Sequence, residues 1–333
     1  MFKKTAILFL PFCLMILISC EKESSYDKNL KDYQSTVEIT TSQNIKHFFF
    51  VGKIGSETGL YKYNLIDNKY ELFWSAPREI VVQLSYSDNL EYAFFITVKR
   101  LGTKRGVSFI RGIKLYRLDL ENSSVELSRK IGDAVQLLAF WFDRNYKIQL
   151  TRFDMKITSH IKKINQIYSS FGKLLNEDIE IYDFIKDSYP QFEIMTTSLI
   201  SPSGNFGIKQ SADSVFLGIS GAVDKVFIDS TAGKINKVKW SPDERYAFFT
   251  AIPVGENEVK RIPYTIYVYD VVNQRILKRW DGENKINFII VNDLLIYDTG
   301  YNYQSAIGVY NYKKNDDVSK IQIRGGCGLI NIL

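Results

Sequence analysis

Residues 239–250 read Lys239-Trp240-Ser241-Pro242-Asp243-Glu244-Arg245-Tyr246-Ala247-Phe248-Phe249-Thr250. Pro242 presets the backbone for the second position of a tight turn, and Asp243 follows it, so a β-turn is expected between two strands. The aromatic run that begins at Tyr246 is expected to form a strand that packs between neighbouring sheets. This turn and strand define a unit that can be sought elsewhere in the chain.

Two repeated patterns extend this unit over the whole chain. Weaker copies of the turn occur at 86–95 and 200–206, and degenerate ones at 143–146 and 292–295. A second pattern of alternating apolar residues closed by a small or polar residue occurs six times, 41 to 55 residues apart. Its copies end at Asn64, Asp119, Ser169, Gly218, Asp270 and Asn311. A period near fifty residues predicts six similar all-β units.

Residues 239–250 resemble the Ser-Pro-Asp-Gly-(Lys/Arg)-Tyr turn of TolB-type β-propeller repeats, with Glu244 in place of the glycine. Elsewhere, over about residues 43–325, the resemblance is one of pattern. It implies an all-β, six-bladed β-propeller of four-stranded antiparallel blades around a central channel. The blades are expected to begin near residues 37, 78, 134, 191, 234 and 284. Gly328–Leu333 is available as a closing strand for the first blade.

One segment has two interpretations. The apolar residues of His160–Leu175 recur every three to four positions, which is helical spacing. Ser169–Lys173 nevertheless looks like a turn between two outer strands. We favour two strands, because they preserve the period of the repeat.

The N-terminus resembles the lipobox of bacterial lipoproteins. Lys3 and Lys4 precede an apolar run that ends in Leu17-Ile18-Ser19-Cys20. The run from Thr5 to Ser19 is shorter than the roughly 20 residues of a membrane-spanning helix. The resemblance implies a lipoprotein signal peptide over 1–19, cleavage before Cys20, and a diacylglycerol on the Cys20 thiol with further acyl chains such as palmitate. A plain secretory signal and a retained anchor are the alternatives.

A polar segment separates this anchor from the repeats. Residues 20–36 carry few apolar side chains, so we expect a flexible tether there, with the β-propeller domain spanning 37–333. Glu21 is not the Asp that tends to retain enterobacterial lipoproteins at the inner membrane, which favours an outer-membrane location in the cell envelope. After cleavage Cys327 would be the remaining free thiol, and we expect it to be buried and inert.

No catalytic constellation is present in the sequence. The string nearest to a nucleophile elbow, Gly218-Ile219-Ser220-Gly221-Ala222, lacks its second glycine and falls in a predicted turn. The chain has 2 histidines, and neither His47 nor His160 has a second ligand at zinc spacing. We therefore predict no enzyme activity, no metal and no cofactor.

One pair of acidic residues could nevertheless form a catalytic site. Alternation along a strand places Asp178 and Glu180 on one face, with Ile179 and Ile181 on the other. Two adjacent carboxylates could form an acid–base pair of the kind used by propeller glycosidases. We prefer a solvated outer strand.

Basic residues cluster in two predicted connections between the second and third strands of a blade. In propellers such connections often border the ligand mouth, and a basic rim would attract acidic proteins or anionic glycans. The formal net charge of +6 is otherwise modest, and export argues against nucleic acid. The predicted binding residues are Lys99, Arg100, Lys104, Arg105, Arg111, Lys260, Arg261 and Tyr264.

These features predict a non-enzymatic envelope protein, attached to the membrane through the lipid on Cys20, whose propeller binds a macromolecular partner. A carbohydrate-binding or carbohydrate-active propeller and a surface adhesin for host matrix are the alternatives. The sequence does not determine how many copies assemble or which side of the membrane they face.

Overall fold

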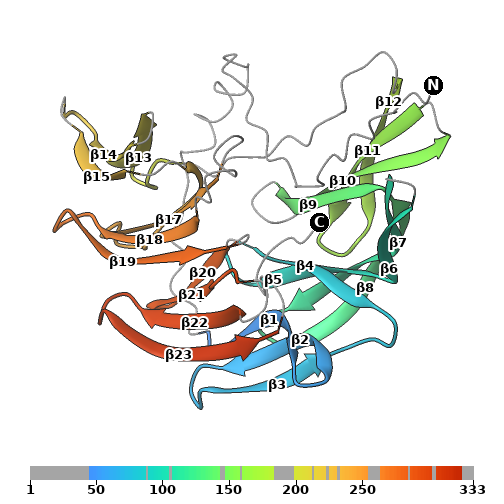
Figure 1. The fold of residues 1–333 in the computed structure, drawn as a ribbon, viewed down its shortest axis with the longest axis horizontal. Helices are drawn as coiled ribbons and strands as arrows, with labels where there is room; N and C mark the ends of the chain where they lie inside the picture. Colours follow the sequence, from blue (N-terminus) through green and yellow to red (C-terminus); the bar gives the residue numbers. More distant parts are fainter. Residues whose placement is uncertain are drawn as a thin grey trace, which may run out of the picture.

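The computed structural model describes residues 45–324 apart from 88, 105–106, 143–146, 158–159, 184–198, 212–213, 223–224, 231–232, 254–262, 284–285 and 302–304. Every element in this part of the chain is a β-strand, and every pairing is antiparallel (Figure 1). The predicted all-β class is therefore confirmed. Cys20, Arg105, Lys260, Arg261, Cys327 and the predicted closing strand Gly328–Leu333 lie outside the described residues.

The strands form six sheets that follow one another along the chain. The first three sheets contain β1 (His47–Ile54), β2 (Glu57–Asn64) and β3 (Lys69–Trp74); β4 (Ile80–Tyr86), β5 (Tyr92–Val98), β6 (Arg100–Lys104), β7 (Val107–Asp119) and β8 (Ser124–Ala134); and β9 (Gln136–Phe142), β10 (Lys147–Ile157), β11 (His160–Ser169) and β12 (Leu174–Asp183). The last three contain β13 (Phe206–Ser211), β14 (Ser214–Ile219) and β15 (Val226–Ser230); β16 (Lys234–Trp240), β17 (Tyr246–Ile252), β18 (Tyr264–Asp270) and β19 (Arg275–Gly282); and β20 (Phe288–Val291), β21 (Leu294–Asp298), β22 (Ser305–Asn311) and β23 (Asp316–Ile323).

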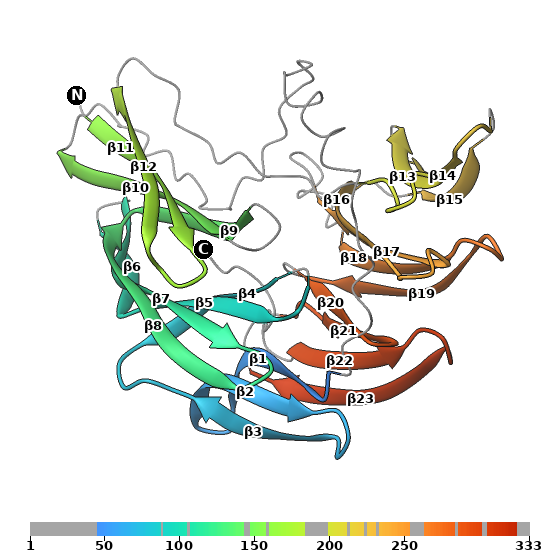
Figure 2. The same cartoon turned by 180° about the vertical axis from the view of Figure 1, so that it is seen from behind.

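The sheets are arranged around the molecule in chain order, and the last lies beside the first (Figures 1 and 2). At this seam the Arg324 N–H donates to the Lys53 carbonyl at 2.8 Å. Gly52 permits the close approach, because a Cβ there would lie 3.0 Å from Ile323 Cγ2. The two ends of the described chain thus meet at a packed contact.

The core lies between neighbouring sheets, as the aromatic strands predicted. All seven residues of β17 are buried, because a middle strand is covered on both faces. One cluster joins the fifth and sixth sheets through Phe248, Ile266, Phe288 and Tyr310. The outer strand β8 has mostly exposed or half-buried residues, since it lies away from these contacts.

The predicted turn recurs with the same geometry in three sheets. In the fifth sheet the Ser241 N–H donates to the Tyr246 carbonyl at 2.9 Å, and the Glu244 N–H donates to the Ser241 carbonyl at 2.8 Å. Glu244 has φ 54°, and the matching residues Leu90 and Gly204 have φ 56° and 76°. The backbone is thus left-handed where the resembling family has glycine, although Glu244 and Leu90 carry side chains.

The segment with two interpretations forms two strands, β11 and β12, joined by a turn in which the Gly172 N–H donates to the Ser169 carbonyl at 2.9 Å. Ile164, Gln166 and Tyr168 are buried, which is alternation at period two. The helical spacing of the isoleucines was coincidental, and the strand prediction is confirmed.

Strand number departs from the uniform four that was expected. Three sheets have four strands, the second has five, and the first and fourth have three among the described residues. The first strands of the second, third, fifth and sixth sheets begin at Ile80, Gln136, Lys234 and Phe288, within four residues of the predicted starts. The starts predicted at 37 and 191 lie outside the described residues. The fifth strand arises from the basic segment of the second sheet.

Candidate functional site

The basic segment of the second sheet forms a β-hairpin instead of the predicted connecting loop. We call residues 99–104 and 107–112 the basic hairpin. Strand β6 continues β5 after an irregularity at Lys99, and the long strand β7 pairs with both. Gly112 has φ 65°, and the Lys99 side chain lies against it, since a Cβ there would be 2.8 Å from Lys99 Cγ. The hairpin therefore extends the sheet as ordered strands.

Two arginines of the hairpin lie directly opposite each other. Arg100 and Arg111 are paired in the register, and both side chains are exposed. Like charges at opposite positions destabilise an antiparallel pair. Neither guanidinium has an ion-pair partner within the part of the chain that the structure describes. The sequence thus places an unfavourable pair of charges where nothing in the described fold requires it.

Both guanidinium groups contact the ring of Phe109. The guanidinium carbons of Arg100 and Arg111 lie 5.6 Å and 5.7 Å from the centroid of the Phe109 ring. The ring covers Gly102 on the facing strand, where a Cβ would lie 2.6 Å from Phe109 Cζ. Cation–π attraction of this kind contributes about 0.5–1 kcal/mol at exposed sites, so the ring helps to hold both groups on one face. Sequence reasoning missed Phe109, although its alternation with Arg111 places both on the same face.

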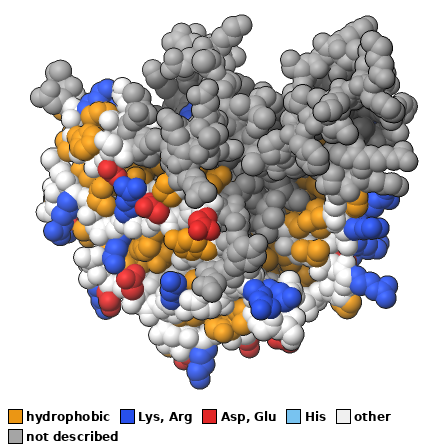
Figure 3. All heavy atoms as spheres, in the orientation of Figure 1, with side chains coloured by type: hydrophobic (Ala, Val, Ile, Leu, Met, Phe, Trp, Pro, Cys, Tyr) orange, Lys and Arg blue, Asp and Glu red, His pale blue; other side chains and the backbone are white. Residues whose placement is uncertain are grey.

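Two other basic residues near the hairpin, Lys114 and Arg117, have partners within the protein. Lys114 is bound to the Glu79 carboxylate, and Arg117 lies 3.6 Å from Glu126 and over the rings of Tyr92 and Phe171. Lys99 is exposed, and Lys104 ends β6. Lys and Arg side chains gather near β6–β8, at the right of the face in Figure 3. Lys114 and Arg117 are therefore engaged by neighbouring side chains of the protein.

Glu79 holds the base of the hairpin through a mostly buried contact. Its carboxylate also accepts hydrogen bonds from Thr97 Oγ1 at 2.7 Å and from the Tyr116 hydroxyl at 3.3 Å. Burial acts to raise the pKa of Glu79, but the bonds from Lys114 and Thr97 outweigh it and lower that pKa below its ordinary value. Glu79 and Lys114 are thus structural partners.

Of the three binding residues predicted in the fifth sheet, only Tyr264 lies among the described residues. Tyr264 begins β18, is half-buried and packs against the core between the fifth and sixth sheets. Its expected partners Lys260 and Arg261 lie outside the described residues. The role of all three in binding stays a prediction.

The two carboxylates considered for acid–base chemistry lie on β12, which pairs only with β11 among the described strands. Glu180 accepts a hydrogen bond from Lys163 Nζ at 3.2 Å, and Asp178 lies opposite Asn165. Ile179 and Ile181 are exposed on the opposite face, as alternation predicted. A carboxylate that is already engaged by a lysine of the neighbouring strand, as Glu180 is, is poorly placed to act as a general acid.

A histidine–serine contact that sequence reasoning missed joins the first two sheets. His47 Nε2 lies 2.7 Å from the Leu120 carbonyl and 3.0 Å from Ser123 Oγ, and Lys62 Nζ donates to that hydroxyl at 2.8 Å. A carbonyl can only accept, so Nε2 carries a proton and cannot take one from the serine. The cluster is therefore not a nucleophile–base pair. Burial lowers the pKa of His47 below its ordinary 6.5, despite the opposing bond to Leu120.

The described residues offer neither a metal site nor a membrane-spanning helix. No group of three His, Cys, Asp or Glu side chains there could hold a metal ion. The same residues contain no helix with the length and apolarity needed to cross a bilayer.

Comparisons with known proteins find distant structural neighbours. No family model and no curated protein sequence matches the chain. Similar solved structures include TolB from Acinetobacter baumannii, with a TM-score of 0.45 and 11% identity over 87% of this chain and 66% of that chain. A proposed 6-phosphogluconolactonase from Bacteroides uniformis has a TM-score of 0.45 and 12% identity over 87% and 99% of the two chains. AztD from Citrobacter koseri has a TM-score of 0.37 and 8% identity over 85% and 96%. At such low identity and overlap, none of them assigns an activity to this chain.

Proposed function

We propose that this chain is a six-bladed β-propeller, held in the cell envelope by a lipid on Cys20, which binds an acidic macromolecular partner and is not an enzyme. The six consecutive antiparallel sheets and the contact between the last and the first support a closed ring. The Leu17–Cys20 motif supports the anchor. The partner would be a protein with a carboxylate-rich surface.

The observation that carries the binding proposal is the pair of opposed arginines. Arg100 and Arg111 are paired across the two strands, both contact the Phe109 ring, and both are exposed. A guanidinium presents two parallel donors that match a carboxylate, so the pair could engage two acidic side chains of a partner. Such a partner would remove the repulsion that the free hairpin carries.

The test is co-purification from detergent-solubilised envelopes with the immobilised protein. The variant Arg100→Ala/Arg111→Ala removes two positive charges from the hairpin. The control Lys173→Ala/Lys314→Ala removes two from exposed turn positions in other sheets. We expect the partner to bind wild type and control and to be lost from the hairpin variant. Added salt should release it, because exposed charges are screened.

Equal recovery on wild type and on the hairpin variant would overturn the assignment of binding to Arg100 and Arg111. Thermal unfolding of both variants checks that the fold is retained. Loss of binding from both variants alike would mean that only net charge matters, which also contradicts a specific site.

A further inference from the structure

Strand β6 of the basic hairpin has a neighbouring strand on one side only among the described residues. It pairs with β7 over residues 100–104, and no other described strand pairs with it (Figure 1). The inner strand β4 does not reach it, because Ile80 begins β4 opposite Val98 on β5. In an antiparallel strand every second residue directs its N–H and carbonyl away from a given neighbour. The free side of β6 therefore presents main-chain groups that could pair with a further strand.

The two faces of β6 differ in chemistry. Residues directly opposite each other in a sheet share a face, and successive residues alternate between the faces. Arg100 is opposite Arg111, and both contact the Phe109 ring, so this face is cationic. Leu101 is opposite Ile110, which is buried in the core between the second and third sheets. Because Leu101 itself is 38% exposed, the other face of β6 extends that core as an apolar surface.

Charges on another edge strand of the molecule are balanced within the protein. On the outer strand β19, Lys278 lies 3.1 Å from Asp317, and Arg279 lies 2.9 Å from Asp229. By contrast, Arg100 has no ion-pair partner in the part of the chain that the structure describes. Cations on an exposed edge discourage pairing with most strands, but they favour a strand with acidic side chains. The edge of β6 thus selects its partner by charge.

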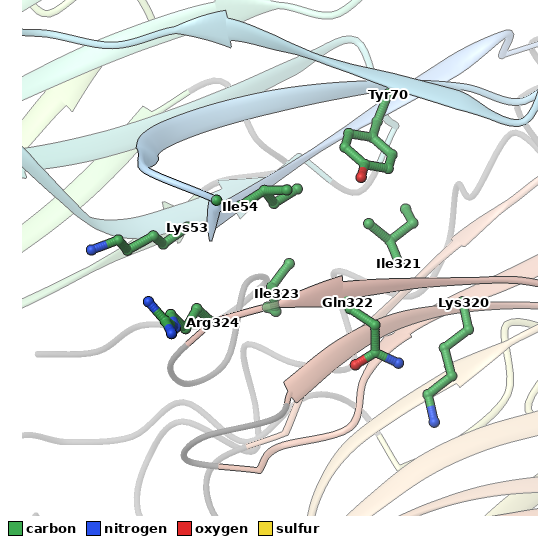
Figure 4. Close-up of a pocket in the computed structure, with 9 residues that line it drawn as sticks. Lys53, Ile54, Tyr70, Lys320, Ile321, Gln322, Ile323 and Arg324 are labelled. Atoms are coloured by element: carbon green, nitrogen blue, oxygen red, sulfur yellow. The ribbon is translucent and has the colours of Figure 1, made fainter.

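The pocket at the seam between the last and first sheets offers a less coherent surface. It has a volume of about 950 Å³ and is lined in part by the end of β23 (Figure 4). Ile321 and Ile323 are buried, and alternation places Lys320 and Gln322 on the opposite face of that strand. The side chains of β23 at this pocket therefore do not face one ligand, whereas the hairpin presents one cationic and one apolar face along a single free edge.

We propose that β6 accepts an extended segment of the partner as an additional strand, in which acidic residues alternate with apolar ones. This inference rests on the function proposed for the hairpin and specifies how the acidic partner is recognised. Main-chain hydrogen bonds to the free side of β6 would supply affinity, and the two faces would supply specificity. A carboxylate opposite Arg100 would accept hydrogen bonds from its guanidinium, and the next residue would lie beside Leu101. Arg111 lies one strand farther away, by about 5 Å, so it would contribute less.

The test is titration calorimetry of the purified, detergent-solubilised protein with three synthetic peptides. The first alternates glutamate and valine, and the second has the same composition arranged as a glutamate block and a valine block. The third is the alternating peptide with N-methyl groups on two successive central residues, which removes a hydrogen-bond donor from each of its edges. We expect the alternating peptide to bind and the other two to bind at least about tenfold more weakly.

Variants of the protein test the assigned contacts. Arg100→Ala should weaken the alternating peptide by about fivefold, because a cross-strand ion pair is lost. Arg111→Ala should have a smaller effect, and Lys173→Ala, with the same change in net charge, should have none. Thermal unfolding checks that each variant retains the fold. A loss with Arg111→Ala that exceeds the loss with Arg100→Ala would contradict a strand added beside β6.

The outcomes separate this inference from the proposed function. Equal affinity for the alternating and block peptides, with the loss in Arg100→Ala retained, would overturn strand addition and leave an acidic partner of the hairpin in place. So would the absence of peptide binding while the envelope partner still co-purifies with the wild-type protein. Binding of the alternating peptide that ignores both arginines would overturn both proposals. A wild-type dimer that dissociates in Arg100→Ala/Arg111→Ala would assign the edge to a second copy and overturn the separate partner.

Discussion

Glu244 shows how one residue combines backbone strain with a compensating contact. Its φ of 54° lies in the left-handed region, which costs a residue with a side chain about 1–2 kcal/mol. Its carboxylate accepts a bond from the Ser203 N–H at 2.6 Å and another from the Ser203 hydroxyl, linking the turns of the fourth and fifth sheets. The glycine of the resembling family would avoid the strain but lose this link.

We predict that Glu244→Gly is more stable than Glu244→Ala by about 1 kcal/mol, as measured by urea unfolding. Both variants lose the contact with Ser203, so their difference isolates the backbone strain. An equal or greater stability of the alanine variant would contradict a left-handed backbone at this position.

His47 is expected to make stability depend on pH. Its pKa in the folded protein is lowered, so the unfolded chain binds a proton more readily than the folded one. Stability is then full above the ordinary pKa of 6.5 and decreases as the pH falls below it. Chemical denaturation between pH 8 and pH 5 should show this loss, and His47→Gln should flatten the part of the curve near 6.5. A variant with an unchanged slope would assign the titration to other groups.

At the scale of elements, the basic hairpin is destabilised by the repulsion between its two opposed arginines. Arg100 and Arg111 occupy opposite positions on β6 and β7, so a Glu at position 111 would face an arginine. We predict that Arg111→Glu is more stable than Arg111→Gln by about 0.5 kcal/mol, since both lose the contact with Phe109 and only the first gains an ion pair.

A double-mutant cycle checks this assignment by thermal or urea unfolding. In an Arg100→Ala background the difference between Glu and Gln at position 111 should disappear. A difference that persists there would mean that position 111 senses another charge.

At the scale of the whole molecule, the proposed lipid anchor would determine where the protein works. We predict that the protein fractionates with membranes and that Cys20→Ala releases it to the soluble fraction, because each buried methylene of an acyl chain contributes about 0.8 kcal/mol of membrane binding. Mass spectrometry of the mature protein should show the lipid on Cys20. Membrane association unchanged by the substitution would mean that the interpretation of Leu17–Cys20 is incorrect.

Protease treatment of intact cells complements this fractionation. Digestion of the anchored protein would place the propeller outside the cell, whereas protection until the outer membrane is opened would place it in the periplasm. The outcome therefore indicates whether the acidic partner is to be sought outside the cell or in the periplasm.

Local chemistry was sufficient for much of the fold. Turn residues and the alternation of apolar side chains act over a few neighbouring positions, and they were enough to predict the all-β class and the start of most sheets. They also predicted the turns after Ser87, Ser201 and Ser241, and the two strands over His160–Ser169 and Leu174–Asp183. The same patterns predicted the position of the basic segment between two paired strands.

Only the tertiary structure decided which side chains meet across long distances in the chain. The opposition of Arg100 and Arg111 depends on a register set by the irregularity at Lys99, which no pattern announces. Lys114 is withdrawn from the rim because Glu79, 35 residues earlier, reaches it. The contact between the last and first sheets brings the Arg324 N–H to the Lys53 carbonyl, although these residues lie near the two ends of the described chain. Such contacts depend on register and on packing between sheets, and sequence periodicity does not specify which individual side chains of separate strands meet.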